Sequence, residues 1–260
     1  MTVGAYYSPL GPGRYRSNPH AEGAWAQDHQ HMAPVAGLLT EAIEAASDRA
    51  DLLTSRIAFD ILGVITAGDL EVTAQVVRPG RTIELVEAEM VIAGRPVVRA
   101  LAWRLATSDT ADFAESGIEP MPGPDSGQPW DGTAEWDGGY IRSVQFRVLP
   151  GRRPGHARAW LTTDVDLVEG AATSDLGKFV GLIDTANGIA ARVDPREILF
   201  PNTDLTVHLF RRPAGRWLGL DTTVSLGPDG VGMTASVLHD LHGPVGRAAQ
   251  TLTVRRRVTG

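Results

Sequence analysis

The chain has 260 residues, a formal net charge of −7 and 43% hydrophobic residues. Its length suits one large or two small domains with a sizeable apolar core. The negative charge argues against a nucleic-acid partner, which needs a basic surface. No apolar run approaches the roughly 20 residues of a membrane span, and no N-terminal segment has the basic-then-apolar pattern of a signal peptide. We therefore expect a cytoplasmic protein without a membrane span.

Cysteine is absent from the chain. This excludes disulfides, thiol catalysis and cysteine metal sites, and it fits the cytosol. His29 and His31 resemble a metal-binding pair, but no further ligands follow nearby in the sequence. We therefore expect neither a metal nor a cofactor.

Arginine supplies nearly all the positive charge, because Lys178 is the only lysine. A GC-rich genome is the plainer explanation of this bias. The alternative is that paired arginines, such as Arg152-Arg153 and Arg211-Arg212, bind phosphate groups through two hydrogen bonds each.

The first half of the chain is predicted to hold an irregular segment, a helix and four strands. Residues 1–24 are rich in Gly, Pro, Tyr and Arg, and they look irregular. Pro34 suits the first position of a helix, and an apolar stripe continues this helix to about residue 46. Alternating apolar residues, punctuated by Gly and Pro, predict strands at residues 56–62, 69–78, 82–93 and 96–106.

Residues 107–139 are acidic and rich in Gly, Pro and Ser, which is typical of a linker. Beyond this linker the same order of elements returns, with two extra strands in front. A helix is predicted from about residue 175 to 193, capped by Thr173 or Ser174. The predicted strands are residues 143–149, 157–167, 203–212, 217–226, 230–238 and 245–256.

Two short segments, residues 96–100 and 244–248, match at an offset of 148 residues. Together with the repeated order of a helix followed by four strands, this match indicates an internal duplication. A helix followed by a curved antiparallel sheet is the hotdog unit, so we predict an α+β double hotdog. Its parts are an N-terminal hotdog (1–106), the linker (107–139) and a C-terminal hotdog (140–260), with the sheets forming one continuous surface.

Three glycines interrupt the second predicted helix. Gly177, Gly181 and Gly188 are expected to let this helix approach the sheet closely. The alternative is that they only weaken the helix, by about 1 kcal/mol each.

Three polar residues occupy positions where the pattern calls for apolar or small ones. Asp184 interrupts a small and apolar helical stretch, and Gln250 shares a strand face with apolar residues. Thr203 shares the predicted strand face of Leu205 and Val207. Buried polar groups without partners cost roughly 1–3 kcal/mol each. We therefore expect the three to contact one another or a water between them, as a hydrolase requires.

These residues resemble the Asp–Thr–Gln triad of the type II acyl-CoA thioesterases, a double-hotdog family. The family's Asp lies on the hotdog helix, where Asp184 stands here. Its Thr stands seven residues before a Phe-x-Arg-Pro motif, as Thr203 precedes Phe210, and its Gln lies in the last strand, as Gln250 does. The resemblance implies that Asp184, Thr203 and Gln250 are catalytic.

The sequence departs from the family ahead of the first helix. Many relatives carry His-Gly-Gly-Pro there, where backbone N–H groups approach the bound thioester, whereas this chain has His31-Met32-Ala33-Pro34. The resemblance implies that His31, Met32 and Ala33 contact the substrate. Loss of both glycines closes off part of that backbone approach.

The implied activity is hydrolysis of acyl-CoA to a free carboxylic acid and CoA. A thioester carbonyl needs only an oriented water, an acceptor for its proton and a donor for the developing oxyanion. Asp184 would accept the proton, with Gln250 and Thr203 holding the water. The competing hypothesis is an acyl-CoA- or lipid-binding hotdog without turnover. The partners expected are the acyl-CoA substrate and a second copy of the chain in a homodimer.

Overall fold

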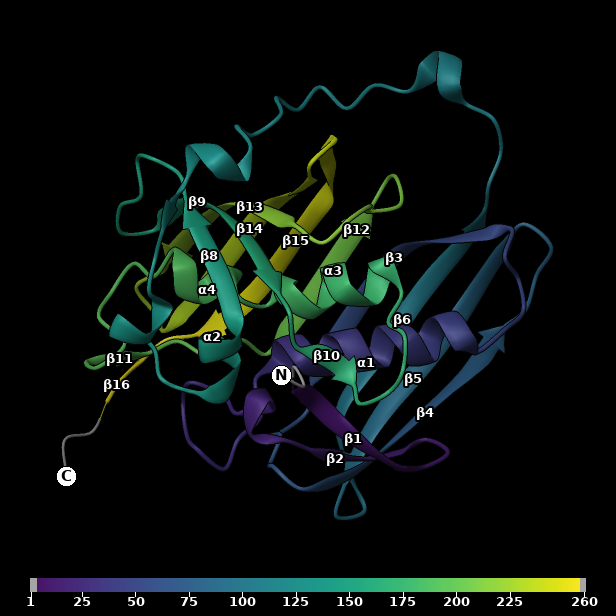
Figure 1. Ribbon diagram of the computed structural model, residues 1–260, viewed down its shortest axis with the longest axis horizontal. Coiled ribbons are helices and arrows are strands. Elements are labelled where there is room, and N and C mark those ends of the chain that lie inside the picture. Colours follow the sequence, from purple (N-terminus) through teal and green to yellow (C-terminus); the bar gives the residue numbers. More distant parts are fainter. Residues whose placement is uncertain (1–3, 258–260) are drawn as a thin grey trace.

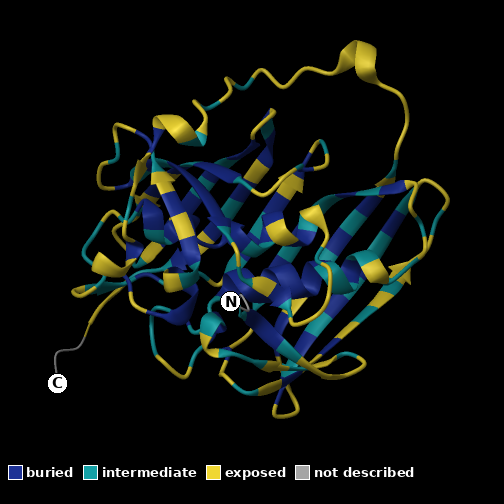
Figure 2. Ribbon diagram, in the orientation of Figure 1, coloured by how far each residue is buried: buried dark blue, intermediate teal, exposed yellow. Residues whose placement is uncertain are grey.

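The computed structural model describes residues 4–257, and two helices lie side by side at its centre, packed against a long sheet (Figure 1). Helix α1 (Met32–Ala45) begins at His31, whose Nδ1 accepts a hydrogen bond from the backbone N–H of Ala33 at 3.1 Å. Helix α3 (Asp175–Ile183) begins at Ser174, whose hydroxyl caps the backbone N–H of Gly177. Most of both helices is buried, as Figure 2 shows.

The first half contains six strands around α1. They are β1 (Ala5–Gly11), β2 (Arg14–Ser17), β3 (Leu52–Ile61), β4 (Asp69–Arg78), β5 (Ile83–Ile92) and β6 (Arg95–Ala106). The predicted strands of this half are all present, with β3 starting earlier than expected.

The second half contains the remaining elements. They are β7 (Gln128–Pro129), α2 (Gly139–Ser143), β8 (Val144–Val148), β9 (His156–Thr163), β10 (Asp166–Val168), α3, α4 (Ala186–Ile189), β11 (Ile198–Leu199), β12 (Asp204–Leu209), β13 (Leu218–Leu226), β14 (Val231–Asp240), β15 (Gly243–Thr253) and β16 (Arg255–Arg256). Short 3-10 turns lie in the connecting segments.

Fourteen strands form one sheet in the order β10-β1-β2-β4-β5-β6-β3-β12-β15-β14-β13-β9-β8-β7. The two halves join where β3 pairs with β12 in antiparallel fashion. The predicted double hotdog with one continuous sheet is therefore confirmed. Residues 107–121 run outside it as an exposed arc (Figures 1 and 2), whereas from Gln128 onward the chain pairs again with the second half through β7.

The expectation that residues 1–24 are irregular is wrong for residues 4–24, and residues 1–3 lie outside the described part of the chain. Strand β1 pairs with β2 in antiparallel fashion and with β10 in parallel fashion, and Tyr6 and Tyr7 are buried. Two of the glycines that suggested an irregular segment make the tight turn between the strands, because Gly11 and Gly13 have φ values of 139° and 66°.

The duplication is visible in the pairing register. Phe59 of β3 pairs with Ala100 of β6, and Val207 of β12 pairs with Ala248 of β15, each residue 148 positions after its counterpart. The offset found in one short segment thus holds for a second strand.

The glycines of α3 allow close approach to the other helix rather than to the sheet. A Cβ at Gly37 of α1 would lie 3.1 Å from the carbonyl oxygen of Gly177 and 3.2 Å from Cα of Gly181. Gly188 lies against Trp136, whose Nε1 would be 3.4 Å from an added Cβ. The expectation of close packing holds, but its partners are α1 and Trp136.

In residues 4–257 no helix is long and apolar enough to cross a membrane.

Candidate functional site

Asp184 lies at a break in the second long helix. The expected continuous helix over residues 175–193 is wrong, because α3 ends at Ile183 and a separate turn, α4, begins at Ala186. The hydroxyl of Thr185 donates to the carbonyl oxygen of Leu182 at 2.7 Å, and the backbone N–H of Thr185 binds the same oxygen. This tightened turn ends the regular hydrogen-bond pattern and leaves Asp184 as the C-terminal cap.

Two side-chain amides hold the carboxylate of Asp184. Nε2 of Gln250 donates to Oδ1 at 2.8 Å, and Nδ2 of Asn202 donates to the same oxygen at 2.7 Å. Asp184 and Gln250 are 7% and 1% exposed. The sequence prediction that Asp184 and Gln250 lie inward and meet is therefore confirmed in geometry.

Thr203 does not join this cluster, and the expectation that its side chain faces inward is wrong. Its side chain is exposed, and the neighbouring Asn202 contacts Asp184 instead. The cause is an irregularity at the start of β12. Within β12 and β15, Thr206 pairs with Ala249. Asn202 pairs with Leu252, which is shifted by one residue from the partner that this register would give it. One extra residue in a strand reverses which side chains point inward.

Burial makes the carboxyl group of Asp184 a weaker acid than usual. It raises the pKa of the carboxyl to about 7, even though the hydrogen bonds from Asn202 and Gln250 lower it. Desolvation penalises the charged form of an acid, whereas a donor to the carboxylate favours that form. A carboxyl with a pKa near neutrality can take and return a proton at working pH.

His31 faces the second oxygen of this carboxylate. Its Nδ1 lies 3.7 Å from Oδ2 of Asp184 and accepts the N–H of Ala33. Burial lowers the pKa of His31 to about 3, so the ring is neutral and the pair is not an ion pair. Because Nδ1 accepts, the ring proton is assigned to Nε2. The ring stacks on Tyr140, with 4.1 Å between centroids.

The other two residues of the predicted substrate-contact stretch are buried. Met32 is 5% exposed and Ala33 is fully buried, and the N–H of Ala33 is already bound by His31. Of the three, only His31 lines the cavity beside Asp184.

That cavity, the aromatic cavity, is small, about 40 Å³, and its lining includes Trp25, Trp130, Trp136 and Phe146. Trp25 and Trp136 face each other edge to face at 5.2 Å, and both pack against Phe200. Polar groups reach it from the helix break, where Tyr140 and Thr185 share a hydrogen bond of 2.7 Å. Sequence reasoning missed Asn202 and Tyr140, although Asn202 stands 148 residues after another hydrogen-bonding side chain, Thr54.

The first half has no matching cluster at the equivalent positions. With the offset of 148, Thr54 is the first-half equivalent of Asn202, and Ala102 is the equivalent of Gln250. Gly37 and Gly181 face one another across the helix pair, so Thr40 takes the place on α1 that Asp184 has on α3. Thr40 only donates back to the carbonyl oxygen of Ala36. Within residues 4–257 the Asp184 cluster is thus confined to the second half.

In the described part of the chain, no group of three or more His, Cys, Asp or Glu side chains is placed to hold a metal ion.

Two family models match the chain. The model of the acyl-CoA thioesterase C-terminal domain matches residues 117–254, and that of the acyl-CoA thioesterase N-terminal domain matches residues 21–105. A comparison with curated proteins gives no match.

Several solved structures have the same fold. A putative thioesterase II from Thermobifida fusca is 18% identical, with coverage of 96% of this chain and 95% of that chain and a TM-score of 0.71. An acyl-CoA thioesterase II, TesB2, from Mycobacterium marinum is 15% identical, with coverage of 98% and 96% and a TM-score of 0.67. A hot dog protein of unknown function from Alicyclobacillus acidocaldarius is 13% identical, with coverage of 97% and 96% and a TM-score of 0.76.

Proposed function

The chain belongs to the acyl-CoA thioesterase family of thioester hydrolases, and we propose that it hydrolyses acyl-CoA with Asp184 as general base. The observation that carries this proposal is the buried carboxylate held through one oxygen by the amides of Asn202 and Gln250. Fixing Oδ1 leaves Oδ2 to exchange a proton. Asn202 takes the role that the sequence resemblance gave to Thr203.

In this mechanism Asp184 removes a proton from water as the water oxygen attacks the thioester carbonyl carbon. Collapse of the tetrahedral intermediate breaks the C–S bond, and the proton held by Asp184 passes to the leaving thiolate. The products are a free carboxylic acid and CoA. With a pKa near 7, Asp184 is basic enough to accept the proton and acidic enough to return it.

Gln250 supplies a second contact for the water. Its Oε1 is buried and has no hydrogen-bond partner among the described residues, while its Nε2 is bound to Asp184. A water that donates one hydrogen to Oε1 and the other to Asp184 would satisfy both acceptors. Gln250 thus orients the nucleophile and also fixes its base.

His31 is the proposed substrate contact at the start of α1. It lines the cavity, it is neutral, and its Nε2–H is the ring donor left after Nδ1 is bound. In the proposal this N–H binds the thioester carbonyl oxygen as negative charge develops on it. Met32 and Ala33 support His31 through the helix turn.

A non-hydrolytic acyl-CoA-binding protein is the second candidate function. The N–H of Ala33 favours it, because this group is bound by His31 and does not point at a thioester. A thiol-release assay with acyl-CoAs from short to long chain separates the two functions. We expect release of CoA by the wild-type protein and none above background by Asp184→Asn. Binding of acyl-CoA without any release would support the second candidate.

A homodimer is also proposed. Light scattering coupled to size exclusion should give about twice the chain mass of 27.8 kDa, and a value of one chain mass would contradict it.

A further inference from the structure

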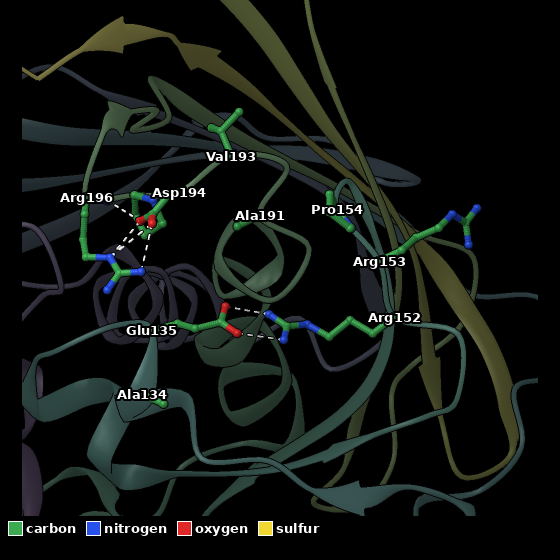
Figure 3. Close-up of a pocket in the computed structure, with 10 residues that line it drawn as sticks. Ala134, Glu135, Arg152, Arg153, Pro154, Ala191, Val193, Asp194 and Arg196 are labelled. Atoms are coloured by element: carbon green, nitrogen blue, oxygen red, sulfur yellow. Dashed lines mark hydrogen bonds and ion pairs between the residues drawn. The ribbon is translucent and has the colours of Figure 1, made fainter.

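A second, larger cleft lies beside the aromatic cavity. Its volume is about 600 Å³, and three arginines line it: Arg152, Arg153 and Arg196. In Figure 3, Arg152 reaches across the cleft to Glu135, while Arg196 and Arg153 lie at opposite sides of it.

The cleft and the aromatic cavity share a wall. The guanidinium of Arg152 stacks over Trp130 at 4.6 Å and donates to the carbonyl oxygen of Ile189 at 3.0 Å. Trp130 and Ile189 both line the aromatic cavity, which also contains Asp184. A molecule with its reacting end at Asp184 would therefore reach the arginines by passing over this wall.

The side chains that line the cleft carry a net positive charge, although the whole chain carries a net negative charge. Arg152 is held by Glu135 and Arg196 by Asp194, so these two charges are matched. Arg153 contacts the ring of His156 at 3.2 Å, and no carboxylate of residues 4–257 lies within ion-pair distance of it. The lining thus carries an excess positive charge while the chain has a net charge of −7.

A further arginine, Arg192, packs against the turn that carries Arg153. An added Cβ at Gly155 would lie 2.5 Å from the guanidinium of Arg192, so that side chain packs tightly under the turn beside Arg153. Arg192 donates through Nε to the carbonyl oxygen of Val224 at 2.8 Å. The turn that carries Arg153 is therefore held in place next to a second positive charge.

We propose that this cleft binds the nucleotide phosphates of a CoA substrate while the thioester carbonyl lies beside Asp184. Planar guanidinium groups bind phosphate oxygens through two parallel hydrogen bonds. Arg153 can supply them because it has no carboxylate partner among residues 4–257, and Arg196 adds an Nη1 that does not bind Asp194. This inference rests on the proposed thioesterase function for its ligand, and it assigns the residues that hold the nucleotide end of that ligand.

A binding experiment tests the cleft without catalysis. Adenosine 3′,5′-bisphosphate, the nucleotide end of CoA, is titrated by calorimetry into the wild-type protein and into the double variant R153A/R196A. We expect the double variant to raise Kd about tenfold, since each lost charged contact is worth a few-fold. The control R81A/R95A removes two exposed arginines of the first half, one before β5 and one at the start of β6, and should leave Kd unchanged. Equal Kd values for both double variants would overturn the proposal.

A kinetic experiment separates this inference from the proposed function. Hydrolysis of an acyl-CoA is compared with hydrolysis of the same acyl group on N-acetylcysteamine, which has no phosphates. We expect R153A/R196A to raise KM for the CoA thioester about tenfold, with kcat/KM for the short thioester unchanged. An unchanged KM for the CoA thioester would refute the cleft while leaving the thioesterase intact. Absence of turnover on both substrates, with bisphosphate binding preserved, would refute the thioesterase and leave the cleft.

Discussion

Asn202 and Thr203 are neighbours in the chain, but the strand irregularity turns them to opposite sides. Asn202 donates to Asp184, whereas Thr203 is exposed. We expect Asn202→Ala to lower kcat about 10- to 100-fold, because it removes one of two donors that fix the base. Thr203→Ala is the matched control and should retain wild-type kcat in the thiol-release assay. The reverse result would restore the triad inferred from sequence.

The acidity of Asp184 predicts a pH profile. With a pKa of about 7, the carboxyl is protonated and unable to act as a base in acid. We expect kcat/KM to rise with pH and to level off above about pH 7, since this ratio reports the free enzyme. Asn202→Ala should move the rise to higher pH, because a lost donor destabilises the carboxylate. A profile that falls between pH 6 and 8 would contradict Asp184 as the base.

The same shift predicts a pH-dependent stability. The pKa of Asp184 is raised from 3.8 to about 7 on folding, so between these values the folded protein holds a proton that the unfolded chain has lost. Stability contributed by this group therefore falls as pH rises through that window. Relative to wild type, Asp184→Asn should gain a few kcal/mol in free energy of unfolding between about pH 4 and pH 7. Urea titrations at several pH values measure it, with the exposed Asp112→Asn as control; a constant difference across this range would contradict the prediction.

At the residue scale, the sequence located Asp184 and Gln250 but not Asn202. A polar residue among apolar ones is a reliable signal while the helix or strand stays regular. The position of Asn202 depends on one extra residue in a strand, which alternation alone does not reveal. The offset of 148 offered the only hint, since Thr54 lies at the equivalent irregularity between β3 and β6.

At the scale of elements, α1 and α3 pack closely at Gly37 and Gly181, and we expect substitution by alanine to have different effects on stability at these two positions. An added Cβ at Gly37 would lie 3.1 Å from a backbone oxygen, whereas one at Gly181 finds its nearest atom at 3.5 Å. Both alanines would gain helix propensity of about 1 kcal/mol, but only the first meets backbone that must shift. We expect Gly37→Ala to be less stable than Gly181→Ala by about 1–2 kcal/mol in urea unfolding. Equal stabilities would show that the helix pair adjusts freely.

Elements with strong periodicity were predicted closely, and those set by distant pairing were not. Strand β4 was predicted at the bounds it has, because its apolar residues alternate between clear turn signals. Strand β1 was missed, because its partners β2 and β10 include a segment more than 150 residues away in the chain. The break after α3 was missed because the Thr185 hydroxyl competes locally with the helix pattern.

At the scale of the whole molecule, the two halves share their order of elements, but the Asp184 cluster lies in the second half alone within residues 4–257. The repeated order of elements predicted the double hotdog and its continuous sheet from the sequence. The candidate site combines Asp184, Asn202 and Gln250 of the second half with His31 of the first, because α1 starts near the residue where α3 ends. The sequence could not place His31 beside Asp184, since that contact depends on how two distant helices cross.

This shared construction predicts that the halves unfold together. Strand β3 pairs with β12 along five residue pairs, and α1 packs on α3, so neither half keeps its core without the other. We expect one transition in urea, with the same midpoint by tryptophan fluorescence and by far-ultraviolet circular dichroism. Gly37→Ala changes the first half only. It should nevertheless shift the fluorescence midpoint, the circular dichroism midpoint and the urea concentration at which thioesterase activity is half lost by the same amount. Two separate transitions, or activity that survives the first of them, would mean that the second half folds and works alone and that His31 is dispensable.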